Sequence, residues 1–183
     1  SMAQRGVARA TDRYERKREE ILDASTEILN RKGVKGLTLS VAAAAVGLST
    51  TSVTYYFKRK DELAAACLMR GVDWLDHVAD EALGEAEPEA RLRRMLAAHL
   101  ERLRQTAAGE APPLPILSDI RALNPPHRTD VFQAYMKVFR KMRQIFDAPD
   151  LAWLTRGRRT ARTHMLLEQI FWAAAWLPKY EPE

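Results

Sequence analysis

Apolar residues recur at helical spacing along almost the whole of this 183-residue chain. A first stripe consists of Ile21, Ala24, Ser25, Ile28 and Leu29, which lie three or four positions apart and share one face of a helix. This stripe predicts a long helix over about residues 12–32. No strand is evident from the pattern of residues. The sequence therefore predicts an all-α fold.

Two short helices are expected next, over residues 39–46 and 50–56. Thr38 and Ser49 precede them and are suited to cap their N-termini, because a hydroxyl oxygen can accept a hydrogen bond from a free backbone N–H. Gly47 between them suits the left-handed conformation that ends a helix. Two short helices joined by a tight turn and held between longer helices form a helix-turn-helix.

The excess of positive charge lies in the first third of the chain. Residues 1–60 carry 12 Lys or Arg and 6 Asp or Glu, whereas residues 61–183 carry 17 and 18. No carboxylate occurs between Glu27 and Asp61. Such a segment favours a polyanionic partner, because each cation near a phosphate releases a condensed counterion. A solvated basic face is the open alternative.

The sequence resembles the TetR family of transcriptional regulators over about residues 14–65. The matching positions are Ile21-Leu22-Asp23-Ala24, Gly33, Thr38, Val41-Ala42, Val46-Gly47-Leu48-Ser49, Val53, Tyr56-Phe57, Lys60 and Leu63. The resemblance implies an Ω-shaped homodimer, with N-terminal helix-turn-helix domains that read successive major grooves and C-terminal helical domains that bind a ligand and form the dimer. Thr54, where the family often has Tyr, and Thr50-Thr51, where it often has Lys-Gly or a similar pair, depart from the family pattern.

The resemblance also implies two sets of DNA contacts. The residues expected to contact phosphates are Thr38, Ser40, Tyr56, Lys58 and Lys60. The residues expected to face the groove are Ser49, Thr50, Thr51, Ser52, Thr54 and Tyr55. None of the second set is Arg, Lys, Asn or Gln, the residue types that form two hydrogen bonds with one base edge, so direct readout should be modest.

The predicted organisation is a flexible basic arm over residues 1–12, a DNA-binding domain over 13–62 and a ligand-binding and dimerisation domain over 63–183. The arm and the residue after it carry Arg5, Arg9 and Arg13, which could enter a narrow minor groove. The alternative for the arm is a tail without a defined contact.

Apolar stripes in the second domain predict helices from about residue 60 to Pro88, from there to about 107, and over 114–123, 128–146 and 155–177. Residues 165–177 are apolar nearly all round, so one side should meet the core and the other a second subunit. The dimer candidates are Leu167, Ile170, Phe171 and Ala174, with Met165, Trp172 and Trp176 as a second stripe. The sequence does not assign either stripe to the partner, and the family's final helix is expected to be absent.

Polar and aromatic residues set into the apolar stripes are the ligand candidates. They are His99, Asp119, Tyr135, His164, Glu168 and Trp172. Each has the alternative of a hydrogen-bonded core residue. The expected effector is a small hydrophobic or aromatic molecule, with room for an anionic end near the arginines of residues 156–162, and its binding is expected to release a repressor from operator DNA.

Other classes of protein fit the sequence poorly. The four His lack Cys or carboxylate partners at metal-ligand spacing, and no Gly-rich phosphate loop follows a strand, so no enzyme, cofactor or metal site is expected. The longest apolar run is too short to cross a bilayer, the single Cys67 cannot form an internal disulfide, and no leader is evident, so a cytoplasmic location is expected. The alternative function is a helical interaction module whose basic first third binds an anionic membrane or an acidic protein surface.

Overall fold

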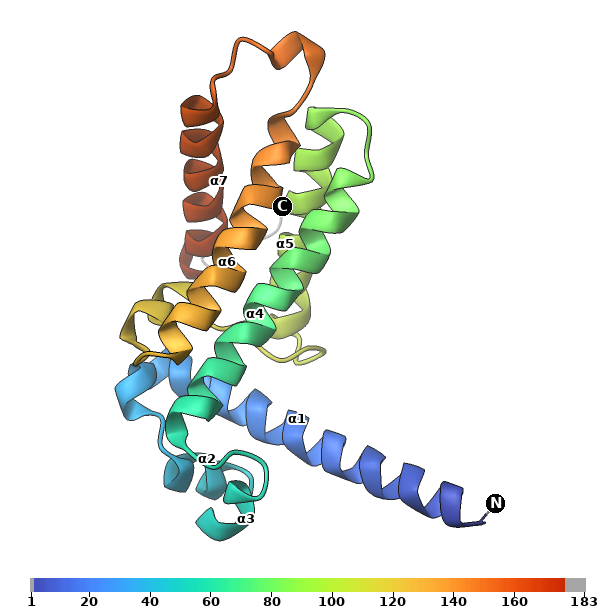
Figure 1. The fold of residues 1–183 in the computed structure, drawn as a ribbon, viewed down its shortest axis with the longest axis vertical. Coiled ribbons are helices and arrows are strands. Elements are labelled where there is room, and N and C mark those ends of the chain that lie inside the picture. Colours follow the sequence, from blue (N-terminus) through green and yellow to red (C-terminus); the bar gives the residue numbers. More distant parts are fainter. Residues whose placement is uncertain (1, 177–183) are drawn as a thin grey trace. The chain divides into compact units, whose positions relative to one another are not determined.

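The computed structural model describes the backbone of residues 2–176 and the side-chain surroundings up to residue 170. Its elements are the α-helices α1 (Met2–Gly36), α2 (Leu39–Ala45), α3 (Thr50–Thr54), α4 (Lys60–Leu83), α5 (Pro88–Ala107), α6 (His127–Arg143) and α7 (Arg156–Trp176), and the 3-10 turns η1 (Leu117–Ala122), η2 (Gln144–Phe146) and η3 (Pro149–Leu151) (Figure 1). The described chain contains no strand. The all-α prediction is confirmed, and most predicted helices agree to within a few residues.

The first helix is longer than the sequence predicted. It begins at Met2, so the structure has helix where the sequence predicted a flexible arm over residues 1–12. The physical reason is composition, because this segment is rich in Ala and Arg, which favour helix, and contains no Pro. The regular helix breaks at Gly33, which has a φ of 72° and a ψ of 179°. The predicted stop at that residue is confirmed.

The described chain packs as two compact units. The first comprises the chain up to Gly71 together with Pro113–Phe132, and the second comprises Val72–Pro112 together with the described chain from Gln133 onward. These units differ from the predicted division between residues 62 and 63, because α4 is shared and residues 113–132 pack with the first unit. The functional boundary itself stays a prediction.

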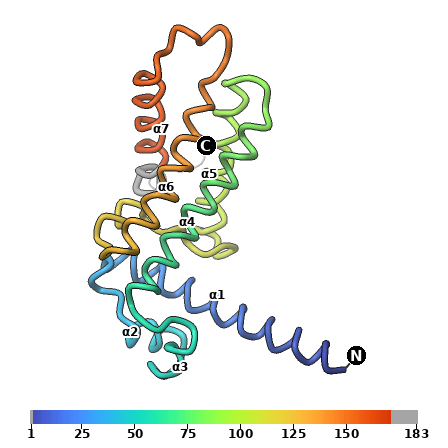
Figure 2. The backbone as a smooth tube through the Cα atoms, in the orientation of Figure 1, coloured from blue at the N-terminus to red at the C-terminus, as the bar shows by residue number. Residues whose placement is uncertain are grey.

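The core of the first unit forms where the apolar stripe of α1 meets α2, α3 and the start of α4. Within this unit α2 packs against both α1 and α3 (Figure 2). Ala42 and Ala43 are buried, because only methyl-sized side chains allow short helices to cross closely. The larger buried side chains are Ile21, Leu22, Ile28, Leu29, Leu37, Val53, Phe57, Leu63 and Leu68. These side chains form the apolar core that holds α2 and α3 against the longer helices.

The segment from Pro113 is held to the first unit by Asn30. Its side-chain Nδ2 donates to the carbonyl of Leu114 over 2.9 Å, and its Oδ1 accepts from the backbone N–H of Ile116 over 3.0 Å. Gly71 of α4 faces the same segment, and a Cβ at this position would lie 2.5 Å from Cγ of Pro115. The lack of a side chain at residue 71 therefore permits the close packing.

Replacing Gly71 by Ala should lower the free energy of unfolding of the first unit. The added methyl must displace Pro115 or α4, and overpacking of this kind costs about 1–3 kcal/mol. The matched control is Gly6→Ala, because a Cβ at residue 6 meets no atom within 4 Å and alanine favours helix. Urea denaturation should show a lower midpoint for Gly71→Ala and no loss for Gly6→Ala. Equal midpoints for the two variants would contradict the assigned contact.

The second unit has a continuous apolar core formed by the later part of α4 together with α5, α6 and α7. Its buried side chains include Val72, Leu75, Val78, Met95, Val138, Phe139, Met142, Ile145, Leu154, Leu167 and Ile170. Beside this core Lys141 of α6 pairs with Asp76 and lies 2.8 Å from Asp80, both on α4. Burial of the core, rather than these partly exposed ion pairs, supplies most of the stability.

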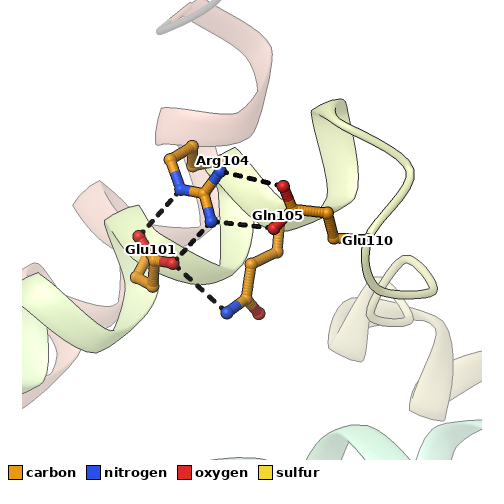
Figure 3. A network of polar contacts seen from close by, with 4 residues as sticks. All are labelled: Glu101, Arg104, Gln105 and Glu110. Carbon is orange, nitrogen blue, oxygen red and sulfur yellow. Dashed lines mark hydrogen bonds and ion pairs between the residues drawn. The ribbon is translucent and has the colours of Figure 1, made fainter.

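The end of α5 is organised by Arg104. Its guanidinium lies 2.8 Å from the carboxylates of Glu101, one turn earlier, and Glu110, beyond the helix end, and Gln105 also donates to Glu101 (Figure 3). Gly109, with a φ of 72°, supplies the left-handed residue that stops the helix. This network closes the turn that follows α5.

Candidate nucleic-acid interface

The turn between α2 and α3 is built by local hydrogen bonds that the sequence predicted. Thr38 Oγ1 accepts from the backbone N–H of Val41 over 3.1 Å, and Ser49 Oγ accepts from that of Ser52 over 3.1 Å. Gly47 has a φ of 69°. The two hydroxyl groups accept hydrogen bonds from free backbone N–H groups at the helix N-termini, and Gly47 turns the chain after α2. These local features hold the two short helices in one arrangement. The predicted N-caps and the predicted turn residue are confirmed.

Helix α3 separates an inner face from an outer face. Val53 is fully buried and Phe57 is 3% exposed, so these side chains fix the helix to the core. Thr50, Thr51 and Tyr55 are exposed, and Tyr55 retains 75% of its accessible surface. α3 ends at Thr54 rather than at the predicted residue 56. The outer face therefore presents hydroxyl groups and one aromatic ring.

Some predicted groove residues already use their hydroxyl groups within the motif. Ser49 and Ser52 share a hydrogen bond between their Oγ atoms over 2.8 Å. Thr54 is half-buried, and its Oγ1 donates to the carbonyl of Thr51 over 2.5 Å. These three side chains shape the helix, which leaves Thr50, Thr51 and Tyr55 as its outward groups.

The predicted phosphate contacts lie on α2, on the turn after α3 and at the start of α4. Ser40, Lys58 and Lys60 are exposed, whereas Thr38 and Tyr56 are half-buried. The backbone N–H of Lys58 donates to Glu62 Oε2 over 3.1 Å, which fixes the turn that carries both lysines. All the predicted DNA-binding residues thus belong to the first unit, and most are accessible.

A tyrosine cluster beside α3 was missed by the sequence analysis. Tyr14 of α1 stacks on Tyr56 with ring centroids 4.8 Å apart, and it meets Tyr55 edge-on at 5.7 Å. The cluster borders a surface hollow of about 530 Å³, whose lining is Ala10, Arg13, Tyr14, Arg16, Lys17, Glu20, Tyr55 and Tyr56. The available signal was the position of Tyr14, seven residues before Ile21 and hence on the same helix face.

Arg70 connects α4 to α1 within the first unit. Its Nη2 lies 2.7 Å from Asp23 Oδ1 and 3.5 Å from Glu19 Oε2. Arg18 of α1 lies over the ring of Phe57, 5.0 Å from its centroid. These contacts hold the helix-turn-helix between the two longer helices.

Of the ligand candidates, His99 is the most buried. It lies on α5, its Nδ1 is 2.8 Å from the carbonyl oxygen of Met95, and its ring meets the ring of Trp74 edge-on at 4.9 Å. Burial lowers the pKa of His99, so the neutral form is favoured.

A second group of ligand candidates surrounds Phe139 in the same unit. The ring of Phe139 lies 6.5 Å from that of Tyr135 and 4.5 Å from that of His164. Burial raises the pKa of Tyr135, and the carboxylate of Glu168 raises it further. His164 and Glu168 are exposed, so this group lies near the surface.

The remaining ligand candidates are Asp119 and Trp172. Asp119 lies on η1, which packs with the first unit, and burial raises the pKa of its carboxyl group. The side chain of Trp172 lies outside the described residues. In the arginine cluster, Arg159 pairs with Asp147 at 3.1 Å, and Arg162 lies 5.8 Å from the centroid of the Trp153 ring. The two arginines therefore already have partners.

The dimer candidates on α7 have different surroundings. Leu167 is 2% exposed and Ile170 is 7% exposed, so both contribute to the core of the second unit within one protomer. Met165 is 68% exposed. The side chains of Phe171 and Ala174 lie outside the described residues. The exposed apolar residue, Met165, therefore belongs to the second stripe and not to the stripe of Leu167 and Ile170.

Neither a metal site nor a membrane span is found in the part of the chain that the structure describes. No group of His, Cys, Asp and Glu there is arranged to hold a metal ion, and no helix is both long and apolar enough to cross a membrane. Cys67 is buried, and burial raises the pKa of its thiol to about 11. A thiol of this kind is mostly protonated near neutral pH.

Comparison of the sequence with known proteins gives matches in the first part of the chain. The family model described as "Bacterial regulatory proteins, tetR family" matches residues 21–67. The HTH-type transcriptional regulator BetI of Paraburkholderia phymatum is 31% identical over 88 residues, which are 46% of this chain and 44% of BetI. BetI of Burkholderia thailandensis is 30% identical over 87 residues, or 46% and 45% of the two chains. The matched segment thus spans less than half the length of these relatives.

Comparison of the fold extends over most of the chain. The TetR-family regulator PfmR of Thermus thermophilus has a TM-score of 0.68 at 19% identity, covering 85% of this chain and 83% of its own. A TetR-family regulator from Bordetella parapertussis has a TM-score of 0.69 at 20% identity, with coverage of 90% and 83%. AibR, solved with isovaleryl coenzyme A and operator DNA, has a TM-score of 0.67 at 17% identity, with coverage of 91% and 88%.

The relatives named here are regulators, in agreement with the expectation that the chain is not an enzyme. Identities at or below 20% establish a common fold, and the match over residues 21–67 places the helix-turn-helix within that fold. Residues 21–67 therefore match the TetR family of bacterial regulatory proteins, and the chain shares the fold of TetR-family regulators.

Proposed function

We propose that this chain is a dimeric transcriptional repressor that binds operator DNA through α3 and releases it when a small hydrophobic or aromatic effector binds the second unit. The DNA-binding part of this proposal rests on one observation, that α3 has a buried side and an exposed polar side. Val53 anchors the helix in the core, while Thr50, Thr51 and Tyr55 are exposed on its outer side. A short helix that is fixed on one side and polar on the other suits the major groove.

The chemistry of this surface favours binding dominated by phosphates. The hydroxyl groups of α3 can form single hydrogen bonds with base edges, and the threonine methyls can contact thymine methyls. Lys58 and Lys60 supply charge beside them. Phosphate contacts set affinity and register, whereas the few base contacts set specificity. Binding should therefore fall steeply as salt concentration rises.

The test compares Lys60→Ala with Tyr55→Ala on an operator selected from a random duplex library and on unselected duplex. Lys60→Ala should weaken binding to both, and it should reduce the slope of log affinity against log salt by about 1, since one phosphate contact is lost. Tyr55→Ala should mainly narrow the difference in binding affinity between the selected operator and the unselected duplex. Fluorescence anisotropy at several salt concentrations between about 50 and 200 mM reports both quantities.

The control is Lys137→Ala, which removes the same charge from an exposed position on α6. It should leave the salt slope unchanged. Unaltered affinities for Lys60→Ala at moderate salt would show that Lys60 does not contact phosphate. Failure of the unmodified protein to bind any duplex would overturn the DNA-binding proposal.

Effector binding is proposed at His99. A carbonyl oxygen can only accept a hydrogen bond, so the Nδ1 that faces Met95 must carry the proton and Nε2 must be an acceptor. Nε2 is buried and has no hydrogen-bond partner among the described residues. An apolar or aromatic molecule with one hydrogen-bond donor would satisfy this atom and contact Trp74. The remaining ligand candidates stay predictions.

Helix α4 is the proposed link between effector and DNA. It is continuous from Lys60 to Leu83, so the same helix carries the proposed phosphate contact and Trp74, which meets His99. A displacement of Trp74 by an effector would therefore be transmitted along a rigid element. AibR, which shares this fold, has been solved in complex with both isovaleryl coenzyme A and operator DNA, so one protein of this fold can bind a small molecule and DNA.

Dimerisation is proposed through the exposed side of α7. Met165 leaves 68% of its surface accessible in one protomer, and an apolar side chain of this exposure gains from burial against a second copy. Trp172 and Trp176, which share the stripe of Met165 in the sequence, are predicted to share this interface, whereas Phe171 and Ala174 share the stripe of Leu167 and Ile170. Leu167 and Ile170 would support it from beneath, since both are buried in the protomer.

A further inference from the structure

The first three turns of α1 form a helix without a packing partner in their own unit. Every residue from Met2 to Arg13 is exposed, and Figure 1 shows these turns extending away from α2 and α3. These turns continue the packed part of α1, so they need no separate nucleation, but they bury no apolar face and gain no stability from packing. A helix of this kind is stabilised when a partner of complementary charge binds it.

The charge of this helix indicates what the partner is. Residues 2–18 carry six cations and only two carboxylates, Asp12 and Glu15. Three of the cations, Arg5, Arg9 and Arg13, follow one another at four-residue spacing and so share one face. Within the described chain, none of these three arginines forms an ion pair with a carboxylate. The face therefore presents guanidinium groups to a polyanion.

This basic face is continuous with the candidate DNA interface. Arg13 lines the same surface hollow as Tyr55 and Tyr56, and Tyr55 is the residue at the C-terminal end of α3. Tyr14, the next residue of α1, stacks on Tyr56 at 4.8 Å. The arginines thus begin at the edge of α3 and continue outward along α1 for about 12 Å from Arg13 to Arg5, at 1.5 Å per residue.

The helical conformation restricts how such a face can meet DNA. An α-helix with its side chains is about 10–12 Å across, whereas the minor groove is about 6 Å wide, so α1 cannot enter it as an extended arm would. The sequence-based expectation of minor-groove insertion by Arg5, Arg9 and Arg13 therefore does not suit this conformation. Arginines four residues apart advance about 6 Å along the helix, close to two base pairs, which suits contacts with successive phosphates.

We propose that the first turns of α1 are a second DNA-contacting surface, in which Arg5, Arg9 and Arg13 bind backbone phosphates that flank the base pairs covered by α3. The inference rests on the DNA binding proposed above. The surface adds affinity without reading sequence, because it contributes only phosphate contacts. It lengthens the stretch of duplex that each protomer needs by about three to four base pairs, since the roughly 12 Å between Arg13 and Arg5 corresponds to that length at about 3.4 Å per base pair.

The test uses the full chain and the triple variant Arg5→Ala/Arg9→Ala/Arg13→Ala, in which alanine preserves the helix. Each protein is titrated with a duplex of the operator alone and with one extended by about five base pairs at each end. The unmodified protein should bind the longer duplex at least tenfold more tightly, whatever the flanking sequence. The variant should bind the longer duplex no more tightly than the operator alone. Its slope of log affinity against log salt concentration should fall by up to about three per protomer.

The matched control is Arg128→Ala/Arg140→Ala/Arg158→Ala, which removes three exposed arginines outside α1. It should keep the gain from the longer duplex. An equal gain in the α1 variant and the unmodified protein would overturn the inference and leave the proposed function intact, and so would an equal loss of the gain in both variants. A protein that binds neither duplex would instead overturn the proposed function.

Discussion

Replacing Met165 by Asp is expected to give a folded monomer, whereas Leu167→Asp is expected to unfold the second unit. The residues lie two positions apart on α7, yet Met165 is 68% exposed and Leu167 is 2% exposed in one protomer. An unpaired carboxylate costs several kcal/mol when it is buried. At residue 167 that cost arises when the protomer folds, and at residue 165 it arises only when two protomers associate.

Light scattering at micromolar concentration and thermal melting distinguish these outcomes. Gln133→Asp is the control, because residue 133 is an exposed polar position on α6 rather than α7, and this variant should remain dimeric with an unchanged melting temperature. A dimeric Met165→Asp protein would place the interface elsewhere. A Leu167→Asp protein that melts like the unmodified chain would contradict the core position of Leu167.

A saturating effector should lower operator affinity tenfold or more. Coupling energies between sites are typically about 1–3 kcal/mol, and a tenfold change needs only about 1.4 kcal/mol of differential binding. Compounds that raise the melting temperature identify candidate effectors, and each is then titrated against the protein–operator complex. The response requires that the effector bind one of two arrangements of α4 more tightly.

The variant His99→Leu should weaken effector binding while leaving operator affinity unchanged, because it removes the buried acceptor at Nε2 without touching the first unit. His77→Leu is the control, since His77 lies on α4 but is 71% exposed at its side chain and faces Glu81. An effector response in His99→Leu equal to that of the unmodified protein would exclude His99 from the site. If stabilising compounds never alter operator affinity at saturation, the sensing mechanism is wrong and the DNA-binding proposal stands.

The local features of the DNA-binding unit could be predicted from the sequence. Thr38 and Ser49 cap helices, and Gly47 adopts a positive φ, because each depends on residues no more than four positions away. The apolar stripe from Ile21 to Leu29 is buried for the same reason, since helical spacing fixes which residues share a face. The extent of α1 was underestimated, because an exposed helix without an apolar stripe gives no periodic signal.

Only the tertiary structure shows what packs against the apolar face of each helix. A stripe shows which residues are apolar but not which residues surround them. The sequence therefore identified Leu167 only as a candidate for the dimer interface, and the structure places it in the protomer core. Tyr14 meets Tyr56 across 42 residues of chain, and Asn30 binds Leu114 across 84, and no local pattern encodes such pairings. The sequence by itself determined the helices, their ends and the basic, hydroxyl-rich motif, because these depend on short-range spacing. Long-range packing determined which candidates became core, which remained exposed and which came together, because burial depends on the whole chain.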